Sequence, residues 1–350
     1  MLLSTGGNSR TLAVMASTMK AMVLERHGRI DSVPLRLFSV PVPQPGPHEV
    51  LVSISVCGIC RTDLHVIEGE LATRRLPIIP GHQAVGKVVV VGSACSRLKV
   101  GELVGIAWLR SACGECEYCA QQRENLCDRS SYTGYHENGG YAEFAVVPEN
   151  FAYIIPEQFS DIDAAPLLCA GIIGYRALRR SNVPQGGKLG LFGFGSSAHI
   201  TLQVALARNC EIFVVTRSEK HRVFAKRLGA SWVGDLNDAV PAALDSAIVF
   251  APVGSIVPQA LRALKKGGTV ATAGIYMTPL PEMDYESCLF HEKQLLSVES
   301  NTREDGADLL REAAEIPIRP LVQTFRFEDA NKALLQLKSD GIEGTGVLML

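Results

Sequence analysis

The sequence predicts an α/β protein with two parts, a β-rich domain and a doubly wound parallel sheet. Three observations carry this prediction. A chain of 350 residues is too long for one ordinary domain. Up to about residue 170 the patterns indicate short strands and loops, with few helical signals. After residue 187, strands and helices alternate at the spacing of parallel βαβ units.

The β-rich part is expected to begin at Met19. We interpret residues 1–18, which contain no acidic or aromatic residue, as a disordered tail; the alternative is a transit peptide. The alternating apolar run at 50–56 predicts a strand in which every second side chain is buried. Four consecutive valines at 88–91 are typical of a strand buried on both faces. Residues 141–147 predict a further strand.

The second part begins with a helix at 161, where acidic residues occupy the first turn. We expect parallel strands and helices from here onwards. The predicted strands are 189–192, 212–216, 246–250 and 269–273, the predicted helices are 198–208, 220–228 and 257–264, and a last strand covers 346–350.

The composition describes a globular protein with a large core, since 47% of the residues are hydrophobic and 20% charged. The net charge of −2 gives no electrostatic reason to expect nucleic acid or a membrane as partner. No apolar run approaches the roughly 18 residues of a membrane-spanning helix. Ten cysteines, six of them at metal-like spacings, suit a reducing compartment, and we expect a cytoplasmic location.

Four cysteines at one place predict a structural zinc site. Cys113, Cys116, Cys119 and Cys127 lie within fifteen residues. Four thiolates close a tetrahedral zinc and leave no position for a substrate. The ion would stabilise a segment that has little hydrophobic core of its own.

Three donors from distant parts of the sequence predict a second zinc site. Cys60 follows the strand at 50–56, His82 lies in a Pro-Gly-His-Gln turn, and Cys169 lies in Leu-Cys-Ala-Gly. Two sulfurs and one imidazole leave the fourth position of the zinc for a substrate. Such an ion acts as a Lewis acid on an alcohol or carbonyl oxygen. The set therefore predicts a catalytic centre.

Polar residues next to Cys60 predict how a proton leaves this centre. The Thr62 hydroxyl and the His65 imidazole could pass the proton of an alcohol to water, because histidine titrates near neutral pH. Asp63 could orient His82 through a hydrogen bond.

The remaining cysteines are interpreted as small buried side chains: Cys57, Cys95, Cys210 and Cys288. Cys57 is the alternative to Cys60 as a zinc ligand. We choose Cys60 because it lies closer to Thr62, Asp63 and His65 in the sequence.

A glycine-rich segment between a predicted strand and a predicted helix indicates a dinucleotide site. Gly193, Gly195 and Ala198 form the pattern Gly-x-Gly-x-x-Ala, with Ser196 inside it. Gly193 would allow the turn, Gly195 would let the backbone approach the pyrophosphate, and Ala198 would pack the helix on the strand.

The end of the next strand favours NADP(H) over NAD(H). Thr216 occupies the position where an acidic residue binds the ribose 2′-hydroxyl in NAD enzymes. Arg217 follows it, with Lys220 nearby, and both could pair with a 2′-phosphate. The alternative is that Arg217 is solvated or stacks on adenine while Thr216 and Ser218 bind a free ribose.

Together these motifs resemble the zinc-dependent medium-chain alcohol dehydrogenases of the medium-chain dehydrogenase/reductase superfamily. The resemblance covers 19–350 and rests on Cys-Gly-Ile-Cys-Arg-Thr-Asp-Leu-His at 57–65, Pro-Gly-His-Gln at 80–83, the four cysteines, Leu-Cys-Ala-Gly at 168–171 and the glycine-rich turn, in the family's order. It implies a GroES-like catalytic domain at 19–170 with a zinc lobe at 108–128, a Rossmann domain at 171–300, and a return to the catalytic domain at 301–350. It also implies homodimers or homotetramers joined through the cofactor domains, and a substrate pocket lined by Trp108.

Three positions depart from the family pattern. Gln83 replaces a glutamate that can approach the zinc. Residues 344–346 lack the basic residue that meets the pyrophosphate in many relatives, so phosphate binding would depend on backbone amides. Residues 66–71 lack bulky aromatic side chains after His65, which favours a wider pocket, suited to medium-chain or aromatic aldehydes.

The sequence thus predicts a zinc- and NAD(P)-dependent alcohol dehydrogenase or aldehyde reductase with two zinc ions per chain and a small alcohol, aldehyde or ketone as substrate. One alternative is a cinnamyl- or polyol-type dehydrogenase on the same scaffold. The alternative from another class is a cofactor-binding structural protein without catalysis.

Overall fold

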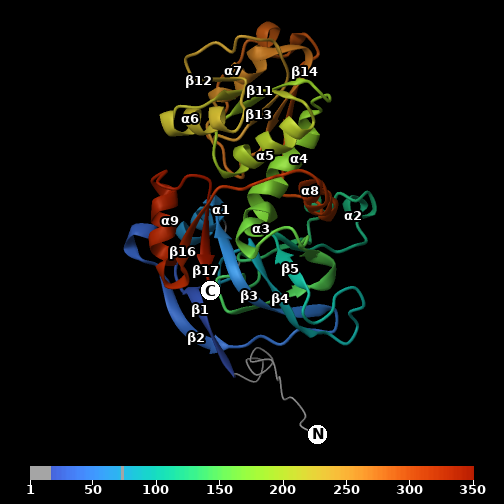
Figure 1. The fold of residues 1–350 in the computed structure, drawn as a ribbon, viewed down its shortest axis with the longest axis vertical. Helices are drawn as coiled ribbons and strands as arrows, with labels where there is room; N and C mark the ends of the chain where they lie inside the picture. The colour runs from blue at the N-terminus through green and yellow to red at the C-terminus, as the bar shows by residue number, and fades with distance from the viewer. Residues whose placement is uncertain (1–16, 72–74) are drawn as a thin grey trace.

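A computed structural model describes residues 17–71 and 75–350, which form two bodies stacked along the long axis of the molecule (Figure 1). Residues 1–16 of the predicted N-terminal tail lie outside the described residues. The first strand starts at Thr18, one residue before the predicted beginning of the fold. No helix among these described residues has the length and apolar content needed to cross a bilayer.

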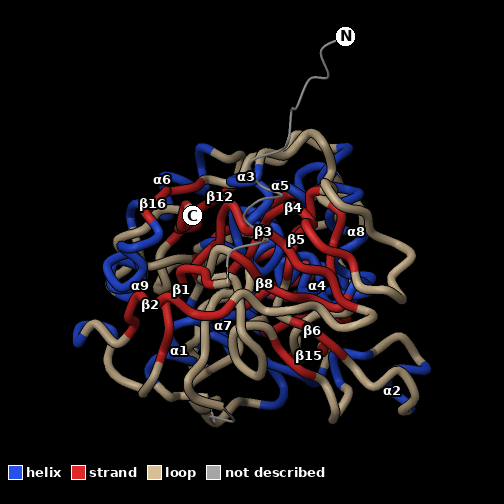
Figure 2. The backbone as a smooth tube through the Cα atoms, turned by 90° about the horizontal axis from the view of Figure 1, so that it is seen from below, coloured by secondary structure: helices blue, strands red, loops and turns tan. Residues whose placement is uncertain are grey.

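The lower body is the predicted β-rich part, built on a sheet in the order β16-β17-β3-β4-β5-β9, with β8 paired to β3. Its strands are β3 (Glu49–Ile59), β4 (Ala84–Val91), β5 (Leu103–Ile106), β8 (Phe144–Pro148), β9 (Ala152–Ile154), β16 (Val322–Arg326) and β17 (Thr345–Met349). Figure 2 shows β3, β4 and β5 beside one another from below. The last strand pairs antiparallel with β3, so the C-terminal segment completes the body that the N-terminal half begins.

Two small antiparallel pairs stand beside this sheet: β1 (Thr18–Leu24) with β2 (Leu35–Pro41), and β6 (Leu109–Ser111) with β7 (Ser131–Tyr132). The second pair closes the base of a loop that contains all four cysteines of the predicted zinc lobe and the short helix α2 (Glu117–Ala120).

The upper body is a six-stranded parallel sheet in the order β12-β11-β10-β13-β14-β15. Its strands are β10 (Lys188–Phe192), β11 (Glu211–Val215), β12 (Trp232–Gly234), β13 (Leu244–Val249), β14 (Leu264–Thr272) and β15 (Gln294–Ser297), and its helices are α5 (Ser196–Ala207), α6 (Glu219–Arg227) and α7 (Ile256–Ala263). The strand order reverses between β10 and β13, which is where doubly wound sheets bind their ligands. The predicted fold class is confirmed.

One nearly continuous helical segment connects the two bodies. It consists of α3 (Asp161–Pro166), a π-helical turn at Leu167–Gly171 and α4 (Ile172–Ser181). Pro166 has no N–H for the helix ladder, and the wider π turn follows at once. Two further helices complete the chain, α8 (Arg303–Glu315) and α9 (Ala330–Lys338).

The burial of two strands differs from the prediction. In β3 the predicted alternation holds from Val52 to Val56, where Ser53 and Ser55 are less buried than the apolar residues beside them. It fails at Leu51, which is buried between the buried Val50 and Val52. In β4 only Val88 of the four valines is buried, so a strand buried on both faces was wrong too.

Two local predictions also need correction. Strand β8 begins at Phe144, and the buried Tyr141 lies in the loop before it. Cys57, Cys210 and Cys288 are buried as predicted, but Cys95 is partly exposed.

The β-rich part contains a helix that the sequence patterns did not predict, α1 (Arg61–Glu68). It starts directly after Cys60, whose sulfur accepts a hydrogen bond from the backbone N–H of Thr62. Asp63 Oδ2 accepts one from the N–H of Cys60 at 2.8 Å, which completes a capping box. The signal was an acid three residues after a residue that can cap, but cysteine is not among the usual caps.

Candidate functional site

Three segments far apart in the sequence bring Cys60, His82 and Cys169 together. The donor atoms of these residues lie within 4.8 Å of one another. Cys60 Sγ is 3.2 Å from His82 Nε2 and 4.0 Å from Cys169 Sγ. Cys60 caps α1, His82 precedes β4, and Cys169 projects from the π-helical turn between the two bodies. Wide π turns are frequent at functional sites.

Asp63 connects two members of this group. Its Oδ2 accepts the hydrogen bond from the Cys60 backbone, and its Oδ1 lies 3.2 Å from His82 Nδ1. The carboxylate and the imidazole are both almost fully buried. When Nδ1–H donates to Asp63, the lone pair of the neutral ring lies on Nε2, 3.2 Å from Cys60 Sγ, which is the tautomer that a metal needs.

The electrostatics of the group suit a cation. The contact with Cys169, together with burial, raises the pKa of the Cys60 thiol. Burial lowers the pKa of His82, but the negative groups of Cys60 and Asp63 outweigh it and raise this pKa to about 10. Without a cation the site holds protons on sulfur and nitrogen that a bound divalent metal would displace. Two soft sulfurs and a neutral imidazole are the ligands that zinc prefers.

Gln83 adds a second observation in favour of a missing group. Its side chain is fully buried, and neither amide atom has a hydrogen-bond partner among the described residues. A buried amide without partners is costly, and Gln83 follows His82 directly. The residues present therefore fit a metal ion held by Cys60, His82 and Cys169, with a further ligand of the ion close to the Gln83 amide.

Thr62 and His65 lie three residues apart on α1, which places them on one side of the helix. His65 Nδ1 contacts the carboxylate of Glu70, and its ring lies 6.2 Å from that of Tyr276 in the upper body. Glu70 was not predicted, because it follows the helix end at Gly69 and carries no motif of its own.

Aromatic rings line one side of the site. The Trp108 ring meets the His82 ring edge-on at a centroid distance of 4.9 Å. Trp108 also stacks with Tyr132 at 5.0 Å and with Tyr135 at 5.9 Å. The two tyrosines were not predicted, since they come from the segment after the four-cysteine loop. Val66 and Ile67 belong to the segment that was expected to leave a wide pocket. Both are buried residues of α1.

The four predicted lobe cysteines also come together, with donor atoms within 4.8 Å of one another. Cys113 Sγ is 3.8 Å from Cys119 Sγ and accepts a hydrogen bond from the N–H of Cys116 at 3.4 Å. Backbone N–H groups of Glu115 and Cys116 lower the pKa of Cys113 to about 6. Cys113, Cys116 and Cys119 are partly exposed, whereas Cys127 is buried.

The glycine-rich turn lies at the end of β10, next to the point where the strand order reverses. Gly193 has φ +91°, and a Cβ there would come within 2.7 Å of the Ala251 backbone nitrogen. A Cβ on Gly195 would meet nothing within 4 Å, and helix α5 starts next to it without a side-chain cap. Ala198 is fully buried against the sheet. The open helix N-terminus leaves room and N–H groups for a phosphate.

Ser196, in the first turn of α5, contacts the hydroxyl of Thr345 in the lower body. Thr345 belongs to the segment 344–346, in which a basic residue was missing, so this segment meets the glycine-rich turn with a hydroxyl instead of a cation. The two bodies touch directly at the predicted cofactor site.

The predicted ribose-binding residues lie at the end of β11. Thr216 is buried, Ser218 precedes α6, and Lys220 and Arg217 are exposed. Arg217 Nη2 is 3.2 Å from Asp340 Oδ2, a residue of the lower body.

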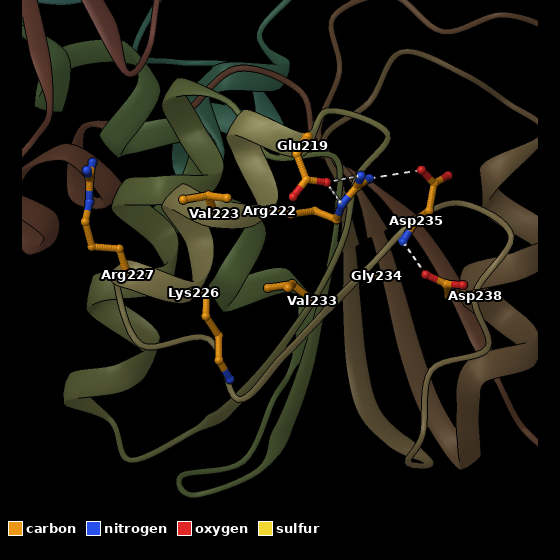
Figure 3. A pocket seen from close by; sticks show the side chains of 9 residues that line it. All are labelled: Glu219, Arg222, Val223, Lys226, Arg227, Val233, Gly234, Asp235 and Asp238. Carbon is orange, nitrogen blue, oxygen red and sulfur yellow. Dashed lines mark hydrogen bonds and ion pairs between the residues drawn. The ribbon is translucent and has the colours of Figure 1, made fainter.

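Arg222, one turn into α6, fixes the backbone of this segment. It donates to the carbonyl oxygens of Thr216 at 2.8 Å and Arg217 at 3.1 Å, and to Asp235 at 2.9 Å. Arg222 also borders an open hollow of about 540 Å³ between α6 and β12 (Figure 3). The residues that line this hollow include none of the predicted site residues.

Comparisons with known proteins show which family the chain resembles. Residues 46–157 match the model of the alcohol dehydrogenase GroES-like domain, and residues 198–315 match that of the zinc-binding dehydrogenases. The chain is 49% identical to the "Probable alcohol dehydrogenase AdhA" of Mycobacterium tuberculosis, over 95% of this chain and 98% of the relative. It is 36% identical to an alcohol dehydrogenase of Geobacillus stearothermophilus, over 95% and 99%. A cinnamyl alcohol dehydrogenase of Sorghum bicolor superposes with a TM-score of 0.86 at 29% identity, over 95% of this chain and 97% of that one.

Proposed function

Because the chain belongs to the zinc-dependent medium-chain alcohol dehydrogenase family, we propose that it exchanges hydride reversibly between a nicotinamide cofactor and an alcohol, aldehyde or ketone at the Cys60–His82–Cys169 group. The observation that carries this proposal is the convergence of two sulfurs and one imidazole, with a fourth position left open, between the two bodies. The four-cysteine loop would hold a second, structural zinc ion.

The chemistry that the bound groups supply is Lewis-acid polarisation of the substrate oxygen by zinc and hydride exchange by the nicotinamide. The chain's own residues bind and orient. Cys60, His82 and Cys169 would hold the ion. Asp63 fixes the His82 tautomer and, through the Cys60 N–H, the position of the sulfur.

We assign the proton path to Thr62 and His65. The Thr62 hydroxyl would accept the proton of the alcohol and pass it to His65, which is partly exposed. The contact with Glu70 orients the His65 imidazole. Glu70 itself is exposed, so the proton can reach water there.

We propose that Gly193, Gly195, Ser196 and Ala198 bind the dinucleotide pyrophosphate, and that Thr216, Arg217, Ser218 and Lys220 bind the adenosine ribose. An exposed guanidinium without an acid at the strand end favours NADP(H). The domain boundaries that suit this division are 19–170, 171–300 and 301–350, with two zinc ions per chain. Assembly into homodimers or homotetramers through the upper body stays a prediction, as does the cytoplasmic location.

The substrate would lie between the metal group and the aromatic rings of Trp108, Tyr132 and Tyr135. Stacked rings favour an apolar or aromatic substituent on the carbonyl carbon. A cinnamyl-type enzyme on the same scaffold is therefore a second candidate, whereas polyols would gain little from this wall. The rates on aryl aldehydes and on sugar alcohols distinguish the two types.

The test is the initial rate of benzaldehyde reduction with NADPH and, separately, with NADH at equal concentration. We expect turnover, with a clear preference for NADPH. A preference for NADH would contradict the cofactor assignment and leave the enzyme class intact. No turnover of any alcohol or aldehyde by a chain that holds zinc would support the non-catalytic alternative.

A further inference from the structure

A carboxylate from the lower body holds the arginine that is assigned to the cofactor phosphate. Asp340 Oδ2 is 3.2 Å from Arg217 Nη2, and Asp340 Oδ1 is 2.6 Å from Arg61 Nη2. Arg61 is the first residue of α1, next to Cys60. One acid thus bridges an arginine of the upper body and an arginine beside the metal group.

Aspartate is unfavourable at position 340, just after the end of α9. It follows the C-terminal end of α9 with φ +55°, and Gly341 N–H donates to the Gln336 carbonyl at 2.8 Å, as in a helix-ending turn. Glycine or asparagine is the usual residue at such a position. A negative charge there also opposes the helix dipole. A residue that breaks both local rules is expected to serve the site.

The surroundings of Asp340 are charged on both sides of the seam between α6 and the end of α9, which lie near each other in Figure 1. The upper body contributes Arg217, Lys220, His221 and Arg227, and the lower body contributes Arg61, Asp340 and Glu343. Glu343 pairs with Arg227 at 3.5 Å, away from Arg217. Asp340 is therefore the acid of this seam that contacts the arginine assigned to the cofactor.

We propose that Asp340 determines cofactor specificity: its carboxylate competes with the 2′-phosphate for Arg217 and so limits the preference for NADP(H) over NAD(H). This inference rests on the proposed function, in which Arg217 binds the phosphate. A phosphate that reaches Arg217 comes close to a carboxylate of the same charge. NAD(H), with a free 2′-hydroxyl, meets no such repulsion.

The pair is open to solvent, with side-chain exposures of 77% for Arg217 and 51% for Asp340. Such a contact exchanges easily. The acid can therefore give way to the phosphate, at the expense of affinity but without unfolding the seam.

The test measures the dissociation constants of NADPH and NADH by calorimetry on the zinc-loaded protein and its Asp340→Asn variant. Asparagine has the same shape and tolerates positive φ, so the turn should be kept. We expect the dissociation constant of NADPH to fall about three- to tenfold, and that of NADH to change less than about twofold. The matched control is Glu343→Gln, which removes the same charge three residues away and should leave the ratio of the two constants unchanged.

An unchanged or raised NADPH dissociation constant in Asp340→Asn would overturn the proposal; a raised value would mean that the acid orients Arg217. Equal gains for both cofactors, or the same gain in Glu343→Gln, would also overturn it. The Arg217→Gln variant tests the assignment of Arg217 to the 2′-phosphate separately from the role of Asp340. If this variant does not weaken NADPH, the assignment of Arg217 in the proposed function fails. If it does, and the gain of Asp340→Asn persists in the double variant, only the role of Asp340 fails.

Discussion

The two cysteine groups of this chain have similar donors but are built in opposite ways. The four lobe cysteines lie within fifteen residues on one loop, whereas Cys60, His82 and Cys169 come from three segments separated by up to 109 residues. The loop brings its donors together by local backbone geometry. The other group exists only if the whole lower body and the connecting helix are folded.

The two cysteine groups also differ in how exposed they are and in which residues surround them. Three of the lobe cysteines are partly exposed at the edge of the molecule, and the four sulfurs leave no coordination position free. The three-donor group lies between the bodies, beside a buried Asp63, an unpaired Gln83 and the Trp108 ring. A closed set of donors can only stabilise, while an open set with an organised surrounding can act on a substrate.

The largest effect is expected for Cys60→Ser. Lewis-acid stabilisation is worth several kcal/mol, so turnover should fall by about 10³-fold or more, while the upper body still binds cofactor. The assay is alcohol oxidation together with calorimetric cofactor binding. The matched control is Cys57→Ala, which changes a buried thiol of the same strand end that is not a donor. Wild-type turnover in Cys60→Ser, or loss of turnover in Cys57→Ala alone, would reverse the assignment of the two cysteines.

Asp63→Asn should have the next largest effect. The two oxygens of Asp63 face two donors, the Cys60 N–H and the His82 Nδ1–H. Asparagine has only one oxygen, so its NH2 group would face one of these donors and that hydrogen bond would be lost. We expect zinc affinity or turnover to fall about 10–100-fold. Zinc retained after dialysis against a chelator, measured by elemental analysis, checks this. Unchanged zinc retention and turnover would mean that the buried carboxylate has no influence on the metal group.

Cys119→Ser tests the other group and should act mainly on stability. Loss of one sulfur opens the structural site, and the lobe loses the ion that substitutes for a core. We expect a melting temperature lower by several degrees, by calorimetry, and measurable turnover at low temperature. If turnover instead disappeared while the melting temperature stayed the same, the division into a structural and a catalytic group would be wrong.

The smallest effect concerns how the lobe is attached to the rest of the chain. Glu124, buried in the lobe, accepts hydrogen bonds from the backbone N–H of Arg303 at 2.9 Å and from its Nε at 3.0 Å, at the start of α8. Burial opposes its charge, but these bonds outweigh burial and hold the pKa of Glu124 below its usual value of 4.5. Its stabilisation is therefore present above about pH 4.5 and is lost as the pH falls through the lowered value.

We expect Glu124→Gln to cost about 1 kcal/mol of unfolding free energy at neutral pH, and the difference from wild type to vanish in acid. Urea unfolding at a series of pH values measures this. A difference that stays constant with pH would show that Glu124 contributes by shape and not by charge.

The comparison also explains how far the sequence could predict the site. The lobe is local, so its spacing alone indicated the four donors. The three-donor group needed the motifs around Cys60, His82 and Cys169, because their proximity is set by strand pairing and by the π turn. The residues that the sequence did not indicate, Glu70, Tyr132 and Tyr135, have no pattern of their own and meet the site only through the folded chain.

Asp340, in the seam between α6 and the end of α9, could not be predicted from the sequence for the same reason. Its position after α9 and its pairing with Arg217 depend on how the C-terminal segment returns to the lower body. The burial of Leu51 in β3 and of the valines at 89–91 in β4 was misjudged for a related reason. Burial there depends on which elements cover the sheet, and the sequence of a single strand does not contain this information.

The most direct test of the account is a crystal structure with anomalous diffraction measured at the zinc absorption edge. We predict two peaks per chain. One lies about 2.3 Å from Cys60 Sγ and Cys169 Sγ and about 2.0–2.1 Å from His82 Nε2, and the other lies among the four lobe sulfurs. A single peak in the lobe, in crystals of protein with full turnover, would contradict the assignment of the three-donor group as the catalytic metal site.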